Sequence, residues 1–224
     1  MVRDAIPFLL LFSLLTLVGF VAHWPIAGAA FLILFLFTAY FFRNPNRVPP
    51  DEPNIIVSPA DGKVTKVGAL DPADPRSAQI VSIFLSPLDV HVNRSPIAGK
   101  ISDVTYTEGR FINAMSPEAS VLNEQNAVTV RNDVIEVVFK QIAGLIARRI
   151  VFWRKAGDTV GLGELVGLIK FGSRTDIIVP HFVSLIVKKG DRVRGATTII
   201  GRYDPEIAGR DKRINQASSA EPKL

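Results

Sequence analysis

Two apolar runs at the start of the chain constrain its fold more than any other feature. Residues 6–22 and 26–42 contain no charged side chain, and only His23, Trp24 and Pro25 separate them. Each run is about 17 residues long, close to the lower limit for a helix that crosses a hydrocarbon layer about 30 Å thick. A water-soluble domain would have to bury both runs, so the sequence predicts a membrane hairpin of two short α-helices joined by a tight turn.

The charges that flank these runs predict how the hairpin is oriented. Arg3 precedes the first run, and Arg43 and Arg47 follow the second. Positive residues favour the cytoplasmic side of a membrane, so we expect an inner-membrane protein whose main domain lies at the cytoplasmic face. Three alternatives remain open. They are a cleaved signal peptide, against which the missing Ala-x-Ala site argues, a hairpin buried in a globular core, and a shallow re-entrant hairpin.

Composition narrows the chemistry that the rest of the chain can perform. There is no cysteine, which excludes disulfides, thiol catalysis and cysteine-ligated metals. Only three histidines are present, so we expect no metal site. The net charge of +5 favours an anionic partner, but it does not distinguish nucleic acid, anionic lipid and a phosphorylated substrate.

The sequence divides into four parts. We expect a membrane-anchoring hairpin at residues 1–43, a proline-rich linker at 44–54, a β-rich catalytic domain at 55–205 and a polar, disordered tail at 206–224. Short β-type runs bounded by Gly, Pro, Asn and Asp fill the third part, which is typical of a β-sandwich or barrel. These runs are 79–85, 127–130, 134–139, 165–169, 177–179, 183–187 and 197–200. One short helix is expected near residues 144–150.

Weak internal repeats refine the fold prediction. Residues 58–67 resemble 95–104, and the Gly-Asp-x-Val segments at 157–160 and 190–193 resemble each other. This arrangement is similar to the barrel-sandwich fold of biotinyl and lipoyl carrier domains. We therefore expect an all-β, lipoyl/biotinyl-like barrel-sandwich domain, preceded by the N-terminal α-helical membrane hairpin.

A Gly-Ser pair at Gly172 and Ser173 offers a route to self-cleavage. Glycine has no Cβ, so its carbonyl is open to attack and its backbone tolerates strained angles. If the Ser173 hydroxyl attacked that carbonyl, an ester would form, and its β-elimination and hydrolysis would leave a pyruvoyl group at residue 173. Such a ketone can form a Schiff base with an amine and accept the electrons of a departing carboxylate. Most Gly-Ser pairs are simple turns, so the pair alone predicts little.

Activation of Ser173 would need a base and a group that orients it. His91 and Asp61 are the candidates, and the three residues could form a nucleophile–base–orienter set, which is defined by geometry and not by sequence order. The alternative is that Asp61 belongs to a turn and that His91 is an ordinary strand residue.

Six segments, taken in order, resemble phosphatidylserine decarboxylases of the short bacterial and archaeal form. They are residues 42–45 (Phe-Arg-Asn-Pro), 58–62 (Ser-Pro-Ala-Asp-Gly), 86–94 (Ser-Pro-Leu-Asp-Val-His-Val-Asn-Arg), 123–126 (Asn-Glu-Gln-Asn), 141–149 and 171–174 (Phe-Gly-Ser-Arg). The resemblance implies a self-processing enzyme that converts phosphatidylserine to phosphatidylethanolamine and CO2 through a Schiff base. It also implies cleavage between Gly172 and Ser173, with a covalent pyruvoyl cofactor derived from Ser173. The β chain 1–172 and the α chain 173–224 would remain together as a heterodimer, which could oligomerise further.

The resemblance also implies roles for individual side chains. His91 would protonate the carbanion left by CO2, since a histidine pKa is ordinarily near neutral. A guanidinium matches a lipid phosphate, and four arginines are candidates for substrate binding: Arg94, Arg148, Arg149 and Arg174. Longer family members carry a second histidine where this chain has Arg94. Either His91 therefore serves both maturation and decarboxylation, or Arg94 has a supporting role.

Three other functions compete with this one. A membrane-tethered, lipoyl-like adaptor or carrier without catalysis would remain one uncut chain. A pyruvoyl decarboxylase for a soluble amino acid would not need the apolar hairpin. A nucleic-acid-binding β domain would explain the charge, but no basic strand studded with aromatic residues is present. We therefore expect phosphatidylserine in the bilayer as the partner, and no nucleic acid.

Overall fold

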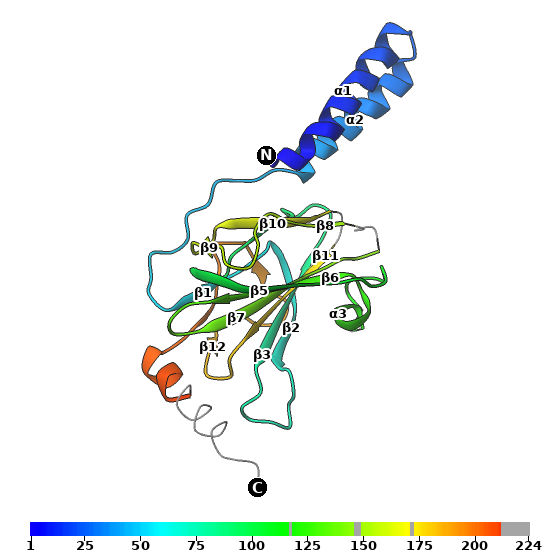
Figure 1. Ribbon diagram of the computed structural model, residues 1–224. Helices are drawn as coiled ribbons and strands as arrows, with labels where there is room; N and C mark the ends of the chain where they lie inside the picture. Colours follow the sequence, from blue (N-terminus) through cyan, green and yellow to red (C-terminus); the bar gives the residue numbers. More distant parts are fainter. Residues whose placement is uncertain (117, 146–148, 171–172, 212–224) are drawn as a thin grey trace.

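The computed structural model describes residues 1–116, 118–145, 149–170 and 173–211. It consists of a pair of N-terminal helices and a curled β domain, with an extended segment leading from one to the other (Figure 1). A short 3-10 helix, η1 (Arg3–Ala5), leads into α1 (Ile6–Val21) and α2 (Pro25–Phe41). The apolar stretch Arg3–Val21 is long enough to cross a membrane, and α2 is a shorter apolar helix.

The two helices lie side by side because a glycine allows a close approach. A Cβ on Gly19 would lie 2.7 Å from the backbone nitrogen of Gly28 in the facing helix, so a larger residue would force the helices apart. His23 adopts a left-handed conformation in the turn, with a φ of 62°. Pro25 starts α2, a position where its fixed φ suits a helix and no N–H is needed.

The described part of the β domain forms three antiparallel sheets. The largest has the strand order β13-β2-β3-β11-β7-β6-β5-β9, and the smaller ones have the orders β4-β10-β8 and β1-β14-β12. Their bounds are β1 (Ile55–Val57), β2 (Gly62–Ala69), β3 (Gln79–Leu85), β4 (Val92–Arg94), β5 (Gly99–Thr107), β6 (Gln125–Arg131), β7 (Glu136–Ile142), β8 (Arg149–Phe152), β9 (Thr159–Val160), β10 (Leu165–Lys170), β11 (Ser173–Val179), β12 (Ser184–Leu185), β13 (Arg192–Val193) and β14 (Ile199–Arg202).

Strand β11 lies deep inside the large sheet. It pairs with β3 on one side, where Ser173 is opposite Leu85, and with β7 on the other. The smaller sheet with β4 and β10 lies over the face of β11 that carries Thr175, because Asn93 of β4 donates a hydrogen bond to the Thr175 hydroxyl. The hydrophobic core fills the space between the curled strands and includes Ile83, Phe139 and Ile177.

The expected architecture, an all-β domain behind an N-terminal helical pair, is confirmed. Each predicted β-type run contains or overlaps a strand, and the run 79–85 coincides with β3. The helix expected near residues 144–150 is wrong in the part that the structure describes. Arg149 begins β8, whose β-branched Ile150 and Val151 pair with β10.

Two short helices were not expected. The first is α3 (Ala119–Leu122). The second covers residues 205–211 and occupies the start of the tail that the sequence suggested is disordered. Its start is stabilised because the Asp204 carboxylate accepts the backbone N–H of Glu206 at 2.8 Å. Asp211, the last residue of the described part, forms an ion pair of 2.8 Å with Arg76.

Candidate active site

Ser173, the proposed nucleophile, opens β11 in a fully buried position. Its side chain is 0% exposed, and its hydroxyl has no hydrogen-bond partner among the residues that the structure describes. Leaving a buried hydroxyl unpaired costs about 1–3 kcal/mol, so such a group calls for a functional explanation. Gly172, the other residue of the predicted cleavage site, lies outside the described residues.

His91 lies in the segment between β3 and β4, beside the strand that leads to Ser173. The His91 carbonyl accepts the backbone N–H of Ile169 in β10 at 3.2 Å. Its ring is 2% exposed, and Nδ1 lies 2.9 Å from the carbonyl oxygen of Asp89. A carbonyl oxygen can only accept, so Nδ1 carries the hydrogen and Nε2 is the acceptor nitrogen. This is the tautomer that a general base requires.

The surroundings of His91 keep it neutral. The ring of Phe41, the last residue of α2, lies 4.1 Å from the His91 ring between centroids. Burial lowers the pKa of His91 from 6.5 to about 4, and the hydrogen bond to Asp89 only partly opposes this. The near-neutral pKa expected from the sequence is therefore wrong, because the sequence does not reveal how completely the imidazole is buried. A neutral imidazole is suited to accepting a proton.

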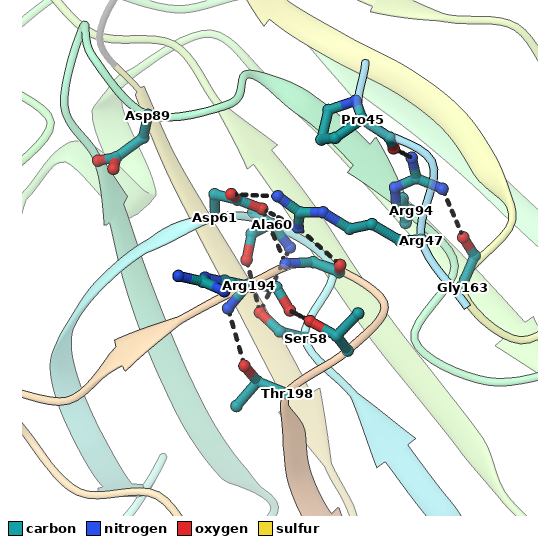
Figure 2. A network of polar contacts seen from close by, with 12 residues as sticks. Pro45, Arg47, Ser58, Ala60, Asp61, Asp89, Arg94, Gly163, Arg194 and Thr198 are labelled. Carbon is teal, nitrogen blue, oxygen red and sulfur yellow. Dashed lines mark hydrogen bonds and ion pairs between the residues drawn. The ribbon is translucent and has the colours of Figure 1, made fainter. Parts of the chain in front are cut away.

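Asp61 is held by the linker and not by a histidine. Arg47 pairs with both of its carboxylate oxygens; Arg47 Nη2 lies 2.6 Å from Oδ2, and Nη1 contacts Oδ1 (Figure 2). The backbone N–H of Gly195 donates to Oδ1 at 2.8 Å. The Asp61 charge nevertheless acts on His91 through space, where it raises the pKa of the imidazole. The structure thus brings Asp61 near His91 as an electrostatic neighbour.

A pocket of about 770 Å³ lies next to these residues. Its walls come from the end of α2, from the loop after β3 and from the segment around β13. They include Tyr40, Ser86, Asp61 and Asp89. Ser86 follows Leu85, the partner of Ser173, and Asp89 holds His91. The pocket therefore adjoins the segments that position both proposed catalytic groups.

Comparison with known proteins identifies the family. The model of the phosphatidylserine decarboxylase family matches residues 34–201. The chain belongs to the phosphatidylserine decarboxylase family. The resemblance carried by the six sequence segments, and the expectation of an enzyme of this family, are thereby confirmed.

Similar proteins, including the following three, carry the name phosphatidylserine decarboxylase proenzyme. The protein from Solibacter usitatus is 51% identical over 178 residues, which cover 80% of this chain and 84% of the relative. The protein from Chlorobium chlorochromatii is 46% identical over 187 residues, covering 83% and 88%. The protein from Desulfotalea psychrophila is 43% identical over 203 residues, covering 89% and 95%.

The four arginines proposed for substrate phosphate differ in their surroundings. Arg94 is buried and donates to the carbonyls of Gly163 and Pro45, both at 3.1 Å, and to the Asn44 side chain at 2.7 Å (Figure 2). Arg174 is buried and donates to the Asp176 carboxylate at 2.6 and 2.9 Å. The protein thus engages both guanidinium groups. Arg149 is exposed at the start of β8, and Arg148 lies outside the described residues.

A chain of buried amides supports the start of β11 in this decarboxylase. Asn126 donates to Gln141 at 3.0 Å, Gln141 donates to Asn93 at 3.0 Å, and Asn93 donates to the Thr175 hydroxyl at 3.1 Å. Thr175 and Ser173 face the same side of β11, because side chains alternate along a strand. The network therefore orients the end of the strand that carries Ser173. Asn126 and Gln141 belong to two of the six segments quoted above.

The foot of the hairpin also reaches the site. We define the foot as Val2, Ala5, Phe41 and Phe42, which are buried against Val90, Val92 and Leu168 of the β domain. An ion pair of 3.6 Å between Lys170 and Asp4 adds to this contact. The sequence predicts only an anchoring role for the hairpin, and it does not reveal that Arg47 pairs with Asp61. The signal for Arg47 was its position just after the Phe-Arg-Asn-Pro segment.

Proposed function

We propose that this decarboxylase cuts its own chain between Gly172 and Ser173 and converts phosphatidylserine to phosphatidylethanolamine and CO2 with a pyruvoyl group derived from Ser173. The observation that carries the proposal is the buried hydroxyl of Ser173, which has no partner among the described residues, together with a neutral His91 beside β10, the strand that precedes Ser173. The word proenzyme in the names of the relatives supports a processed chain. The residues present fit the formation of this group, because nucleophile, base and a site sheltered from water are all available.

The first stage is an acyl shift within the chain. Ser173 Oγ attacks the carbonyl carbon of Gly172 while Nε2 of His91 accepts the hydroxyl proton. The bond from Gly172 to the Ser173 nitrogen breaks, the nitrogen takes up a proton, and an ester remains. Asp61 favours the protonated imidazole during this step through its charge. Arg47 keeps Asp61 in place, and Arg94 has a supporting role, since it ties the linker to the β domain.

The second stage opens the ester. Nε2 of His91, neutral again, accepts the Cα proton of Ser173, the Cβ–O bond breaks, and the Gly172 carboxylate is released at the end of the β chain. One water then replaces the nitrogen of residue 173, ammonia leaves, and the α chain begins with a ketone. When present, this group captures a primary amine and accepts the electron pair left by a departing carboxylate. Neutral His91 can take up at Nε2 the proton that the substrate ammonium loses, and it then supplies this proton to the carbon that has lost CO2.

The two chains would remain associated after the cut as a heterodimer. Strand β11 begins at Ser173 and lies between β3 and β7, which both belong to the β chain. Cleavage leaves both hydrogen-bonded ladders intact. The new end of the α chain would therefore stay in place at the start of β11.

The hairpin would hold the site at the cytoplasmic face of the cell's inner membrane. The exposed apolar surface of α1 and α2 supports membrane association, and Arg3, Arg43 and Arg47 favour the cytoplasmic side. A two-chain lipid would then reach the pocket beside α2 without leaving the bilayer.

Replacing the proposed nucleophile tests this function. Full-length Ser173→Ala is expected to remain one chain of 24.5 kDa and to release no CO2 from phosphatidylserine in mixed micelles. The matched control is Ser184→Ala, because Ser184 is exposed in β12 and has no role in the proposal. Cleavage or turnover by the Ser173→Ala protein would contradict the proposal. A tethered carrier without catalysis would leave the wild type uncut as well.

A further inference from the structure

We propose that the pocket at the foot of α2 binds the phosphodiester of the lipid headgroup and that Arg194 is its phosphate-binding residue. This inference rests on the proposed function, because it concerns the substrate of the same site. Three arginines line the pocket, namely Arg43, Arg192 and Arg194. None of them was among the four candidates chosen from the sequence.

The position of the pocket suits a headgroup that stays in the bilayer. Tyr40 lies in the last turn of α2, and Arg43 follows the helix directly. Aromatic and basic residues at the end of a membrane helix favour the interface between hydrocarbon and water. Both line the pocket, so its mouth lies at the depth where phosphates of the surrounding lipids are found.

Protein groups already engage two of the three arginines. Arg43 donates to the Leu88 carbonyl at 2.7 Å, and its guanidinium lies 3.8 Å from the centre of the Tyr40 ring. Arg192 faces the Asp89 carboxylate at 3.2 Å. These contacts engage the guanidinium groups of both Arg43 and Arg192.

Arg194 differs from the other two. Its backbone N–H is bonded to the Thr198 hydroxyl at 2.9 Å, but its guanidinium has neither an ion pair nor a hydrogen bond within the described residues. The nearby carboxylate of Asp61 is neutralised by Arg47 (Figure 2). Arg194 is therefore a cation that lines the pocket with no acidic partner in the described part of the chain, and a phosphodiester would supply the missing charge in a geometry that a guanidinium matches.

The same pocket also explains how the reacting end of the lipid is placed. The wall at Ser86 and Asp89 adjoins Leu85, opposite Ser173, and the carbonyl that holds His91. A phosphate held at Arg194 leaves the serine part of the headgroup to extend along this wall. Free serine lacks the phosphate, so Arg194 would favour the lipid over the amino acid.

A pair of substrates tests the assignment in the full-length enzyme. Arg194→Gln should mature normally and show a KM for phosphatidylserine raised about 10- to 100-fold, as expected for the loss of a charge-assisted contact, with little change in kcat. A serine amphiphile of equal chain length, joined through an ester instead of a phosphodiester, should show the same KM with both proteins. The matched control is Arg131→Gln, which removes an exposed charge in β6 away from the pocket.

Each outcome decides the matter. The assignment is supported if only the phosphate-containing substrate distinguishes Arg194→Gln from Arg131→Gln. It is overturned if the two variants have equal KM values for phosphatidylserine, or if Arg194→Gln weakens both substrates equally. Absence of phosphatidylserine turnover by the wild type would instead overturn the proposed function together with this pocket.

Discussion

The hairpin of α1 and α2 differs at its two ends in what surrounds its apolar side chains. Towards the turn, large residues are open, with Leu17 62% and Ile33 67% exposed. At the foot, Phe41 is 1% exposed and Phe42 is 2% exposed, because the β domain covers them. Apolar residues of one hairpin thus meet two environments. The outer part is exposed apolar surface that a membrane would bury, while the foot forms a wall beside His91.

Shortening one apolar side chain in each part of the hairpin tests this difference with the largest expected effect. Phe41→Ala is expected to lower the free energy of unfolding by about 3–5 kcal/mol, since it leaves a cavity in a fully buried contact with His91. Ile33→Ala, in the exposed part, should change it little when detergent covers the helix. Unfolding of the uncut Ser173→Ala protein in detergent micelles measures both. If Phe41→Ala fails to accumulate, Phe41→Leu offers a milder test. Equal effects at the two ends would contradict the account.

The pH dependence of stability should sharpen the role of the foot. The pKa of His91 is about 4 in the folded protein and 6.5 in the unfolded chain, so the unfolded chain binds the proton first as the pH falls. The contribution of His91 to the free energy of unfolding is fully present above pH 6.5 and decreases by about 3 kcal/mol as the pH falls to 4.

Comparison with a variant isolates this contribution. Between pH 6.5 and pH 4, the free energy of unfolding should fall by about 3 kcal/mol less in His91→Gln than in the protein with His91. Both proteins carry Ser173→Ala in this measurement. His181→Gln is the control, since His181 lies near Asp211 at the start of the tail. If the free energy of unfolding depends on pH in the same way with His91 and with His91→Gln, the foot does not keep His91 neutral.

Removing the charge of Asp61, which lies in the β domain, should have a smaller effect than the changes at Phe41 and His91. Asp61→Asn keeps the shape of the side chain but removes the charge that favours protonated His91. Self-cleavage should slow about tenfold, which corresponds to about 1.4 kcal/mol. A time course of chain cleavage on denaturing gels measures this. Asp191→Asn, a change in an exposed turn, is the control. An unchanged rate in Asp61→Asn would remove Asp61 from maturation.

Much of the fold was predictable because its signals are local. Short β-type runs between turn residues located the strands, including β3 and β10. The expected helix at residues 144–150 is wrong in its described part because strand β8 depends on a distant partner. Ile150 and Val151 pair with β10, and the local sequence does not show this pairing. The helix at 205–211 had a local signal in Asp204 and Pro205, which the polar composition of the tail obscured.

The candidate site was predictable only in part, because its contacts join distant segments. The short motifs named Ser173, His91 and Asp61. A sequence motif does not show which groups bind an arginine in the folded protein. Arg94 and Arg174 were therefore candidates for phosphate binding, although Arg94 donates to Asn44 and Arg174 donates to Asp176. Arg47 and Arg194 meet around Asp61 only through folding, which brings the linker and the segment after β13 together.

Intact-mass measurement of the purified wild type tests the central claim most directly. We predict two polypeptides, one ending at Gly172 and one beginning at residue 173, with the second lighter by one ammonia than a chain with an unmodified serine at its start. A single uncut polypeptide of 24.5 kDa from a preparation that decarboxylates phosphatidylserine would contradict the account.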